Sequence, residues 1–504
     1  MNHPISQRVR TMGLSKADSW PKTFTDGDAS RRIAAGVVFC LAMAIAAPAQ
    51  TFKVLLDFNG SNGGYPYQMS LIQGRDGNLY GTTNVGGSNQ FGTIFKVTTA
   101  GSLTTLFSFY AGVGINPFTG LILATDGNFY GTTEAGGASG YGTVFKITPS
   151  GTLTTLHSFN NRDGAYPISP LIQATDGNFY GTTWYGGNSG QGTIFKISAT
   201  GTFSTLYSFC ALSSCADGAL GTAGLVQADD GNFYGTTAQG GNVACNPPSG
   251  CGTVFRVTSR GALTTLHVFC AIARCADGES PSALFQANDG SFYGTTNEGG
   301  SLACDSPYGC GTVFKINSQG TLTTLHSFGF SDGAVPFAPA VQGTDGNLYG
   351  TTSQGGLEGC MLGCGTLFTI TTSGKLSTLH LFDDIQGGNP YGSVLQATNG
   401  VFYGTTEYGG EVNYGIAFSL DVGLGPFVTF VSRFGRTGTA AQILGNGLST
   451  ATAVTFNGVP AQSFKVLSDT FMKAVVPPGA ISGPVQVTTP TRQLTSNENL
   501  IVEP

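Results

Sequence analysis

The segment LIQATDGNFYGTTWYGGNSGQGTIFKISATGTFSTLYSF, residues 171–209, decides the fold. It contains four short runs rich in Phe, Tyr, Ile and Thr, residue types that are enriched in strands. Asp176-Gly177 separates the first two runs and suits a tight hairpin turn, because Gly adopts positive φ at little cost. A glycine-rich loop, residues 186–190, leads to the third run, and a turn ending at Gly201 leads to the fourth. The pattern predicts four antiparallel strands, the content of one β-propeller blade.

The tetrapeptide Tyr-Gly-Thr-Thr in this segment occurs seven times along the chain, in steps of 50 to 59 residues. Its copies begin at Tyr80, Tyr130, Tyr180, Tyr234, Tyr293, Tyr349 and Tyr403. A repeat of this period is typical of propellers and arrays. The repeats open with a fourth-strand sequence, residues 51–58, and finish with a third-strand sequence, residues 414–420. We expect these two to pair and close a seven-bladed β-propeller over residues 50–425, because their pairing leaves no open sheet edge.

Composition excludes several classes of protein. Charged residues make up 10% of the 504 residues, the net charge is −6 and the pI is about 5.3. The chain therefore lacks the basic surface that nucleic acid requires. No window shows a sustained 3.6-residue apolar period, so we expect an all-β protein with almost no helix. Because no G-x-S-x-G, H-E-x-x-H or Walker loop is present, we assign no catalytic residue, no metal site and no cofactor.

Residues 1–49 have the pattern of a signal peptide. Arg31-Arg32 precede an apolar stretch, residues 33–47, that is too short to span a membrane comfortably. Ala47-Pro48-Ala49 has the small residues of a cleavage site, so we expect cleavage before Gln50. Sec export is favoured over the twin-arginine route. The mature chain then has no membrane span, and we expect a secreted or cell-surface monomer.

Residues 426–504 lack the repeat and form a second β-domain in our interpretation, with short strand-like runs broken by Gly, Pro and Asn. The segment resembles an IPT/TIG domain through Gly445-Asn446-Gly447 and residues 454–458, 476–479 and 483–487. Ser432-Arg433-Phe434 replaces the proline that is usual near the start. The resemblance implies an Ig-like β-sandwich and no particular function.

Ten cysteines follow the predicted signal peptide in five close pairs. The pairs are Cys210/Cys215, Cys245/Cys251, Cys270/Cys275, Cys304/Cys310 and Cys360/Cys364. Local pairing in an exported chain predicts five disulfides that stiffen long loops, and compact CxxC groups with His, as zinc requires, are missing. All five pairs lie between the second and third strands of a blade or between consecutive blades. These connections emerge on one face, the looped face, where a rigid scaffold usually carries its binding residues.

Aromatic residues of the looped face are the candidate ligand-binding residues. The dipeptide that follows each Tyr-Gly-Thr-Thr varies within a fixed frame, which indicates surface loops. The aromatic candidates in these dipeptides are Trp184, Tyr185 and Tyr408, and Tyr141, Tyr308 and Tyr414 are candidates nearby. Together they would offer a platform for a sugar ring; alternatively, they only cover loop or blade surface.

Three carboxylates at the same positions, Glu134, Glu298 and Glu407, are the groups that glycoside hydrolysis would recruit. That chemistry requires two carboxyl groups about 5–9.5 Å apart, and spacing along the chain does not show that these converge. The alternative is that they are solvated loop acids.

Two other repeated positions have structural interpretations. His157, His267, His326 and His380 recur in the fourth strand, where Tyr, Phe and Leu replace them in other copies. This substitution pattern indicates a packing position and argues against catalysis or metal binding. Six of seven first strands carry Gln, with Leu123 as the exception, and these side chains either line a channel or bond neighbouring backbone.

The repeat, L-I-Q-A-T-D-G-N-F-Y-G-T-T followed by G-T-V-F-K-I-T and G-T-L-T-T-L-H-S-F, resembles the Gloeo/Verruco (GloVer) repeat over about residues 51–420. The resemblance to choice-of-anchor tandem repeat GloVer-containing proteins implies a secreted or cell-surface bacterial protein. Our first hypothesis is a non-catalytic binding or adhesion module for an extracellular glycan or surface protein. The alternatives are an enzyme acting on extracellular polysaccharide, a glycoside hydrolase or lyase, and a purely structural surface protein.

Overall fold

A computed structural model describes residues 50–503 except 222, 306, 357–359 and 361; the predicted signal peptide and its cleavage site therefore fall almost entirely outside the described residues. The described chain is all-β, as predicted. Its helical segments are short 3₁₀ turns, η1 (Ser213–Cys215), η2 (Ala273–Cys275) and η3 (Leu448–Thr450). Among the described residues, no helix is long and apolar enough to cross a membrane.

The repeats form successive four-stranded antiparallel sheets, each built like a propeller blade. We number them sheet 1 to sheet 7. Their strands are, in sheet 1, β2 (Ile72–Gln73), β3 (Leu79–Thr83), β4 (Thr93–Val97) and β5 (Leu103–Ser108); in sheet 2, β6 (Ile122–Leu123), β7 (Phe129–Thr133), β8 (Thr143–Ile147) and β9 (Leu153–Ser158); in sheet 3, β10 (Ile172–Gln173), β11 (Phe179–Thr183), β12 (Thr193–Ile197) and β13 (Phe203–Ser208); in sheet 4, β14 (Val226–Gln227), β15 (Phe233–Thr237), β16 (Thr253–Val257) and β17 (Leu263–Val268); in sheet 5, β18 (Glu279–Gln286), β19 (Phe292–Glu298), β20 (Thr312–Ile316) and β21 (Leu322–Ser327); in sheet 6, β22 (Val341–Gln342), β23 (Leu348–Thr352), β24 (Thr366–Ile370) and β25 (Leu376–Leu381); and in sheet 7, β26 (Leu395–Gln396), β27 (Phe402–Thr406), β28 (Ile416–Asp421) and β1 (Thr51–Asp57).

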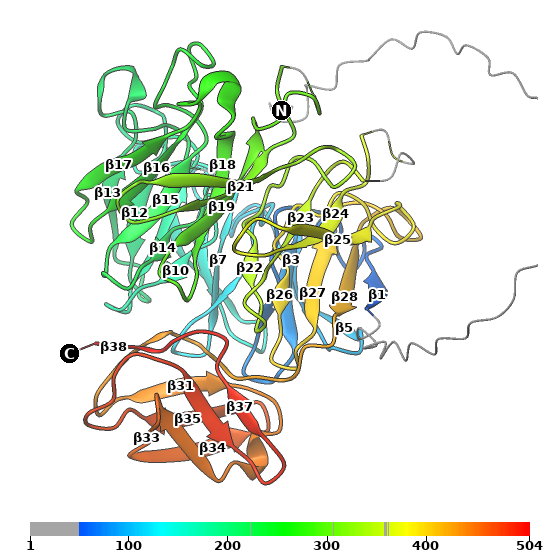
Figure 1. The fold of residues 1–504 in the computed structure, drawn as a ribbon, viewed down its shortest axis with the longest axis vertical. Helices are drawn as coiled ribbons and strands as arrows, with labels where there is room; N and C mark the ends of the chain where they lie inside the picture. Colours follow the sequence, from blue (N-terminus) through cyan, green and yellow to red (C-terminus); the bar gives the residue numbers. More distant parts are fainter. Residues whose placement is uncertain (1–49, 222, 306, 357–359, 361, 504) are drawn as a thin grey trace, which may run out of the picture. The chain divides into compact units, whose positions relative to one another are not determined.

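Sheet 7 joins the two ends of the repeat region. β1 pairs antiparallel with β28 from Thr51 opposite Asp421 to Asp57 opposite Ile416, and Figure 1 shows the blue β1 beside β28. The predicted pairing of these segments is confirmed. The spare N-terminal strand thus covers the edge that the last repeat leaves open.

Tyr-Gly-Thr-Thr forms the buried second strand of each sheet, and its Tyr, its Gly and its second Thr each have a packing role. In sheet 2, the Tyr130 ring stacks on Phe179 of sheet 3 with centroids 3.9 Å apart, and its hydroxyl donates to the Asp126 carboxylate at 2.9 Å. A Cβ on Gly131 would lie 2.7 Å from the Phe145 ring, so only Gly fits. The Thr133 and Thr143 hydroxyls are 2.8 Å apart and join the second strand to the third.

Glutamines of the first strands link consecutive sheets. Gln173 of sheet 3 accepts the Thr125 backbone N–H of sheet 2 at 2.9 Å, and Gln73 of sheet 1 accepts the Thr398 N–H of sheet 7 at 2.9 Å. Of the two interpretations that the sequence left open, bonding to neighbouring backbone is confirmed. Between sheets 1 and 2, where Leu123 replaces Gln, Arg75 instead donates to the Thr125 carbonyl at 2.8 Å.

The C-terminal residues form two four-stranded sheets around one apolar core that includes Val428, Ile443, Met472 and Val485. The first sheet contains β29 (Thr429–Phe430), β31 (Ala440–Leu444), β35 (Phe471–Val475) and β34 (Ser463–Ser468), and the second contains β33 (Val459–Pro460), β32 (Ala453–Phe456), β36 (Val485–Thr488) and β37 (Gln493–Thr495). A parallel pair, β30 (Phe434–Arg436) with β38 (Ile501–Glu503), completes the segment.

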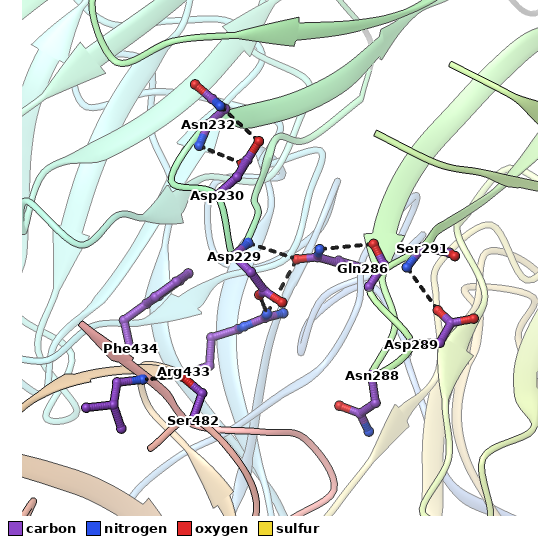
Figure 2. Close-up of polar contacts among 12 residues, drawn as sticks. Asp229, Asp230, Asn232, Gln286, Asn288, Asp289, Ser291, Arg433, Phe434 and Ser482 are labelled. Carbon is purple, nitrogen blue, oxygen red and sulfur yellow. Dashed lines mark hydrogen bonds and ion pairs between the residues drawn. The ribbon is translucent and has the colours of Figure 1, made fainter. Parts of the chain in front are cut away.

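Polar contacts join this segment to the hairpin turns of the repeats, at the end of the sheets opposite the looped face. Arg433 reaches Asp229 and Gln286, which itself accepts the Asp229 backbone N–H at 3.3 Å (Figure 2). Asn288 donates to the Asn497 carbonyl at 2.8 Å. These contacts of the C-terminal segment therefore involve the hairpin turns and not the longer connections of the looped face.

Candidate functional site

Five disulfides stiffen the connections of the looped face, and each joins the two members of one predicted pair. Cys210–Cys215 lies in the connection between sheets 3 and 4, and Cys270–Cys275 lies in the connection between sheets 4 and 5; each second cysteine ends a 3₁₀ turn. The prediction of local disulfides is confirmed.

The other three disulfides lie between the second and third strands of sheets 4, 5 and 6. They are Cys245–Cys251, Cys304–Cys310 and Cys360–Cys364. All six cysteines lie in the predicted connections, but the second member of each pair is buried: Cys310 has 2% of its surface exposed, and Cys251 and Cys364 are fully buried.

The burial of Cys310 follows from its position two residues before β20, where the chain already enters the sheet. Its side chain belongs to an apolar cluster that includes Phe328 and Ala334, against which the half-buried Cys304 packs. The Cys304–Cys310 disulfide therefore anchors its loop to the core between sheets and does more than stiffen the loop itself.

Three of the fourth-strand histidines, His157, His267 and His326, hold the looped connections through carboxylates, which the sequence interpretation of a plain packing position missed. His157 lies 3.0 Å from the Asp163 carboxylate, and His326 lies 2.8 Å from that of Asp332. In sheet 3, Tyr207 takes the place of His and donates to Asp217 at 2.7 Å. The sequence signal that could have predicted these contacts is an Asp-Gly pair that recurs in the connections between consecutive sheets, at Asp163, Asp217 and Asp332.

The six predicted ligand-binding aromatics differ in exposure. Trp184 is buried, with 8% of its surface exposed, contrary to the expectation of a surface-loop residue, whereas Tyr408 and Tyr308 are 37% and 47% exposed. Tyr185, Tyr141 and Tyr414 are half-buried. Tyr308 lies in the separate connection between β19 and β20.

The other five fall into two aromatic groups on the looped face. Near sheet 7, the Tyr65 ring lies 5.4 Å from Tyr408 and 5.2 Å from Tyr414. Near sheet 3, the Tyr166 ring lies 6.1 Å from Tyr141 and 6.2 Å from Tyr185, and Tyr185 lies 4.8 Å from Trp184.

Aromatic residues that sequence reasoning missed lie between these groups. Tyr67 lies 4.6 Å from Phe118 and 4.5 Å from Tyr391, whose ring is 5.0 Å from Phe337. Each follows a proline just before a first strand, and this repeated Pro-aromatic pair was the signal that could have found them. Tyr391, Tyr67 and Phe118, the residues after this proline in sheets 7, 1 and 2, are therefore in contact, so this position of successive repeats comes together in space.

A set of aromatic residues therefore lies on the looped face, and its groups near sheets 1 and 3 are joined, because Phe118 and Trp184 share an apolar cluster against which Tyr67, Tyr166 and Tyr185 pack. We call it the aromatic tract; its members are Tyr414, Tyr65, Tyr408, Tyr67, Tyr391, Phe337, Phe118, Trp184, Tyr185, Tyr166 and Tyr141.

Two of the three candidate carboxylates, Glu134 and Glu407, are held beside connections that carry aromatic residues of the tract: their backbone N–H groups donate to the carbonyls of Asn116 and Asn389, two residues before Phe118 and Tyr391. Burial raises the pKa of Glu407 to about 8, against a smaller lowering by the Tyr408 hydroxyl. The pKa of Tyr67 is raised well above its ordinary value by burial and then by Tyr391, Glu407, Tyr408 and Glu134, so both carboxyl groups act on one phenol. Glu298, at the end of β19, instead lies opposite Glu279 of β18.

The described connections of the looped face are acidic. Their basic residues are the two arginines Arg162 and Arg274. Their acidic residues, counting strand ends, are Asp57, Glu134, Asp163, Asp217, Asp277, Glu279, Glu298, Asp305, Asp332, Asp383, Asp384, Glu407 and Glu411. An anionic ligand would meet repulsion over this face.

Comparison with known proteins identifies the repeat. Among solved structures, the chain is similar to a putative 6-phosphogluconolactonase from Bacteroides uniformis (15% identity, TM-score 0.42, covering 82% of this chain and 99% of that one) and to a gluconolactonase from Xanthomonas campestris (14% identity, TM-score 0.36, covering 65% and 89%). These likenesses are too distant to bear on activity. No curated protein matches the chain. The family model described as Gloeobacter/Verrucomicrobia repeat matches residues 23–246 and 222–465, and the chain belongs to this family.

Proposed function

We propose that this chain is an exported, non-catalytic binding module for extracellular carbohydrate. In this proposal a signal peptide, residues 1–49, is removed, residues 50–425 form a seven-bladed propeller, and residues 426–504 form an Ig-like domain of the IPT/TIG type. The five disulfides fit an extracellular protein.

The aromatic tract is the observation that carries the proposal. Tyr391 touches both Tyr67 and Phe337, and all three are only half-buried, so part of each residue remains exposed. A planar aromatic ring stacks on the apolar face of a sugar with little loss of side-chain freedom. A row of such rings suits an extended chain of sugars better than a single small molecule.

Binding to an array of glycans, followed by titration of the bound glycan against residues 50–504, tests the proposal. Tyr391→Ala and Tyr67→Ala are expected to weaken binding at least about fivefold, because each stacking contact contributes about 1 kcal/mol. Tyr110→Ala is the matched control, since Tyr110 is 49% exposed in the β5–β6 connection and lies outside the tract. Equal binding by all three variants, with melting temperatures unchanged, would exclude the tract as the binding surface.

A second candidate function, glycoside hydrolysis, is supported by one observation: Glu134 and Glu407 are bonded through their backbone to the connections that carry Phe118 and Tyr391, both of which contact Tyr67. A carboxyl group with a raised pKa and a second carboxylate nearby are the parts that glycosidases use. Release of reducing ends from the bound glycan, abolished by Glu407→Gln, would favour the enzyme over the binding module.

A further inference from the structure

We infer that, within the carbohydrate-binding role proposed above, the looped face holds two equivalent tyrosine subsites, which one non-acidic polysaccharide chain occupies together. Subsite A lies at the connection that leads from sheet 7 into sheet 1, and subsite B lies at the connection that leads from sheet 2 into sheet 3. Subsite A consists of Tyr65, Tyr408 and Tyr414, and subsite B consists of Tyr166, Tyr141 and Tyr185.

One pair of tyrosines occupies the same repeat positions in both subsites. Tyr65 and Tyr166 each precede a proline and have a left-handed backbone, with φ of 49° and 55°. The backbone N–H of Tyr65 donates to the Tyr414 carbonyl at 2.9 Å, and that of Tyr166 donates to the Tyr141 carbonyl at 2.9 Å. The rings of these two pairs lie 5.2 Å and 6.1 Å apart. Because a positive φ is uncommon for a residue other than Gly, this shared backbone presents both pairs from equivalent places.

The fold does not require tyrosine at either position of the pair. At the other five junctions between sheets, the residue equivalent to Tyr65 also has positive φ and donates its backbone N–H to the residue equivalent to Tyr414. These donor and acceptor residues are Asn116 and Phe91, Leu220 and Gln191, Ser280 and Cys251, Val335 and Cys310, and Asn389 and Cys364. The same backbone thus carries amide, aliphatic, hydroxyl and sulfur side chains, so the two Tyr–Tyr pairs point to a contact outside the chain.

A third tyrosine extends each subsite. The Tyr408 ring of sheet 7 lies 5.4 Å from that of Tyr65, and the Tyr185 ring of sheet 3 lies 6.2 Å from that of Tyr166. Tyr408 is 37% exposed and the other five tyrosines are half-buried, so part of every one remains exposed. A Tyr ring stacks on the apolar face of a sugar, while its hydroxyl group donates to or accepts from the hydroxyl groups of the sugar.

Exposed carboxylates beside subsite A limit the class of polysaccharide. Asp383, Asp384 and Glu411 are exposed on the connections next to Tyr408. The Asp384 carbonyl accepts the backbone N–H of Gly410, two residues after Tyr408, at 3.0 Å. Polymers of uronate or sulfated sugars would be repelled here, so the ligand is a non-acidic polysaccharide.

Two subsites on one rigid scaffold make affinity depend on chain length. Sheets 1 and 2 separate subsite A from subsite B. A short oligomer can reach only one subsite, whereas a long chain that has bound one subsite meets the other at high effective concentration. Such coupling strengthens binding by at least about 100-fold without any new kind of contact.

Calorimetric titration of residues 50–504 tests the inference with oligomers of amylose, laminarin, mannan and xylan, each as its dimer and as its decamer. For a polymer that binds, we expect two dimers but one decamer per protein, with the decamer at least about 100-fold tighter. Tyr65→Ala and Tyr166→Ala should each leave one dimer site and weaken decamer binding at least about tenfold. Gln191→Ala, at the position equivalent to Tyr141, is the matched control and should change neither quantity.

The outcomes separate this inference from the proposal on which it rests. A single dimer site in the parent, a decamer no tighter than the dimer, or an equal loss in Gln191→Ala overturns the two-subsite inference and leaves the carbohydrate-binding role intact. If none of these oligomers binds, the inference fails, and the glycan array then decides on the proposed function, which fails as well when the array captures no binding. If a Tyr variant does not fold, the number of dimer sites and the chain-length dependence of the parent decide.

Discussion

The Arg75 guanidinium lies 4.7 Å from the centre of the Phe471 ring, and this contact joins the repeats to the C-terminal segment. The same guanidinium donates to the Thr125 carbonyl of sheet 2 at 2.8 Å and to Gln442, which also donates to that carbonyl at 2.8 Å. Arg75 therefore bridges sheets 1 and 2 at the one junction where Leu123 replaces the linking Gln, and the C-terminal segment holds Arg75 in place.

Arg75→Ala is expected to destabilise the protein by about 2 kcal/mol, because it removes a cation–π contact and hydrogen bonds at a partly buried site. Urea unfolding of residues 50–504 measures the free energy of unfolding. Arg162→Ala, which changes an exposed arginine of the looped face, should leave it within about 0.5 kcal/mol. A loss below that value in Arg75→Ala would show that this junction does not depend on the arginine.

Asp277 should contribute stability at neutral pH that is lost in acid. Burial raises its pKa, but hydrogen bonds from His267 and from the backbone N–H groups of Ile272 and Ala271 outweigh burial, so the pKa is lowered. A lowered pKa stabilises the fold above the unfolded value, near 3.8, and this gain disappears as the pH falls through the folded value. Asp277→Asn should cost about 1–2 kcal/mol at pH 7 and much less at pH 3.

Unfolding in urea at both pH values, with exposed Asp305→Asn as control, tests this dependence on Asp277. An equal cost at pH 7 and pH 3 would show that the effect of Asp277→Asn comes from packing and not from the carboxylate.

Glu407→Gln should stabilise the protein at alkaline pH. The folded pKa of Glu407, about 8, exceeds its ordinary value of 4.5, so the folded chain binds more protons than the unfolded chain between these values and loses stability as the pH rises through this window. Glutamine has no charge to bury. The variant should gain roughly 1–3 kcal/mol at pH 9 and about nothing at pH 4; a gain that does not change with pH would contradict the assignment.

Removal of β1 should destabilise sheet 7, because it exposes the edge of β28. Residues 59–504 should melt at least about 5–10 °C below residues 50–504, or fail to fold. Phe52→Ala offers a milder test, since the Phe52 ring stacks on His380 with centroids 3.7 Å apart and also contacts Phe418. Unchanged melting of both the truncated chain and Phe52→Ala would show that β1 contributes little.

Local sequence alone determined the strands, the hairpin turns, the cysteine pairs and the pairing of the first strand with the last repeat. The strands and turns depend on short-range chemistry that recurs in every repeat, as when Asp176-Gly177 sets a turn and Gly181 admits the Phe195 ring. The cysteine pairs follow from close spacing, and the pairing of the first strand with the last repeat follows from the offset between the two ends of the repeat region.

Only the tertiary structure decided that Trp184 and Cys310 are buried, that Tyr67 meets Tyr391, and that Glu407 acts on the same phenol as a carboxylate of another sheet. The reason is physical: residues of different repeats lie dozens of positions apart in sequence. The packing of one sheet against the next, which no local pattern encodes, brings some of them together and leaves others apart.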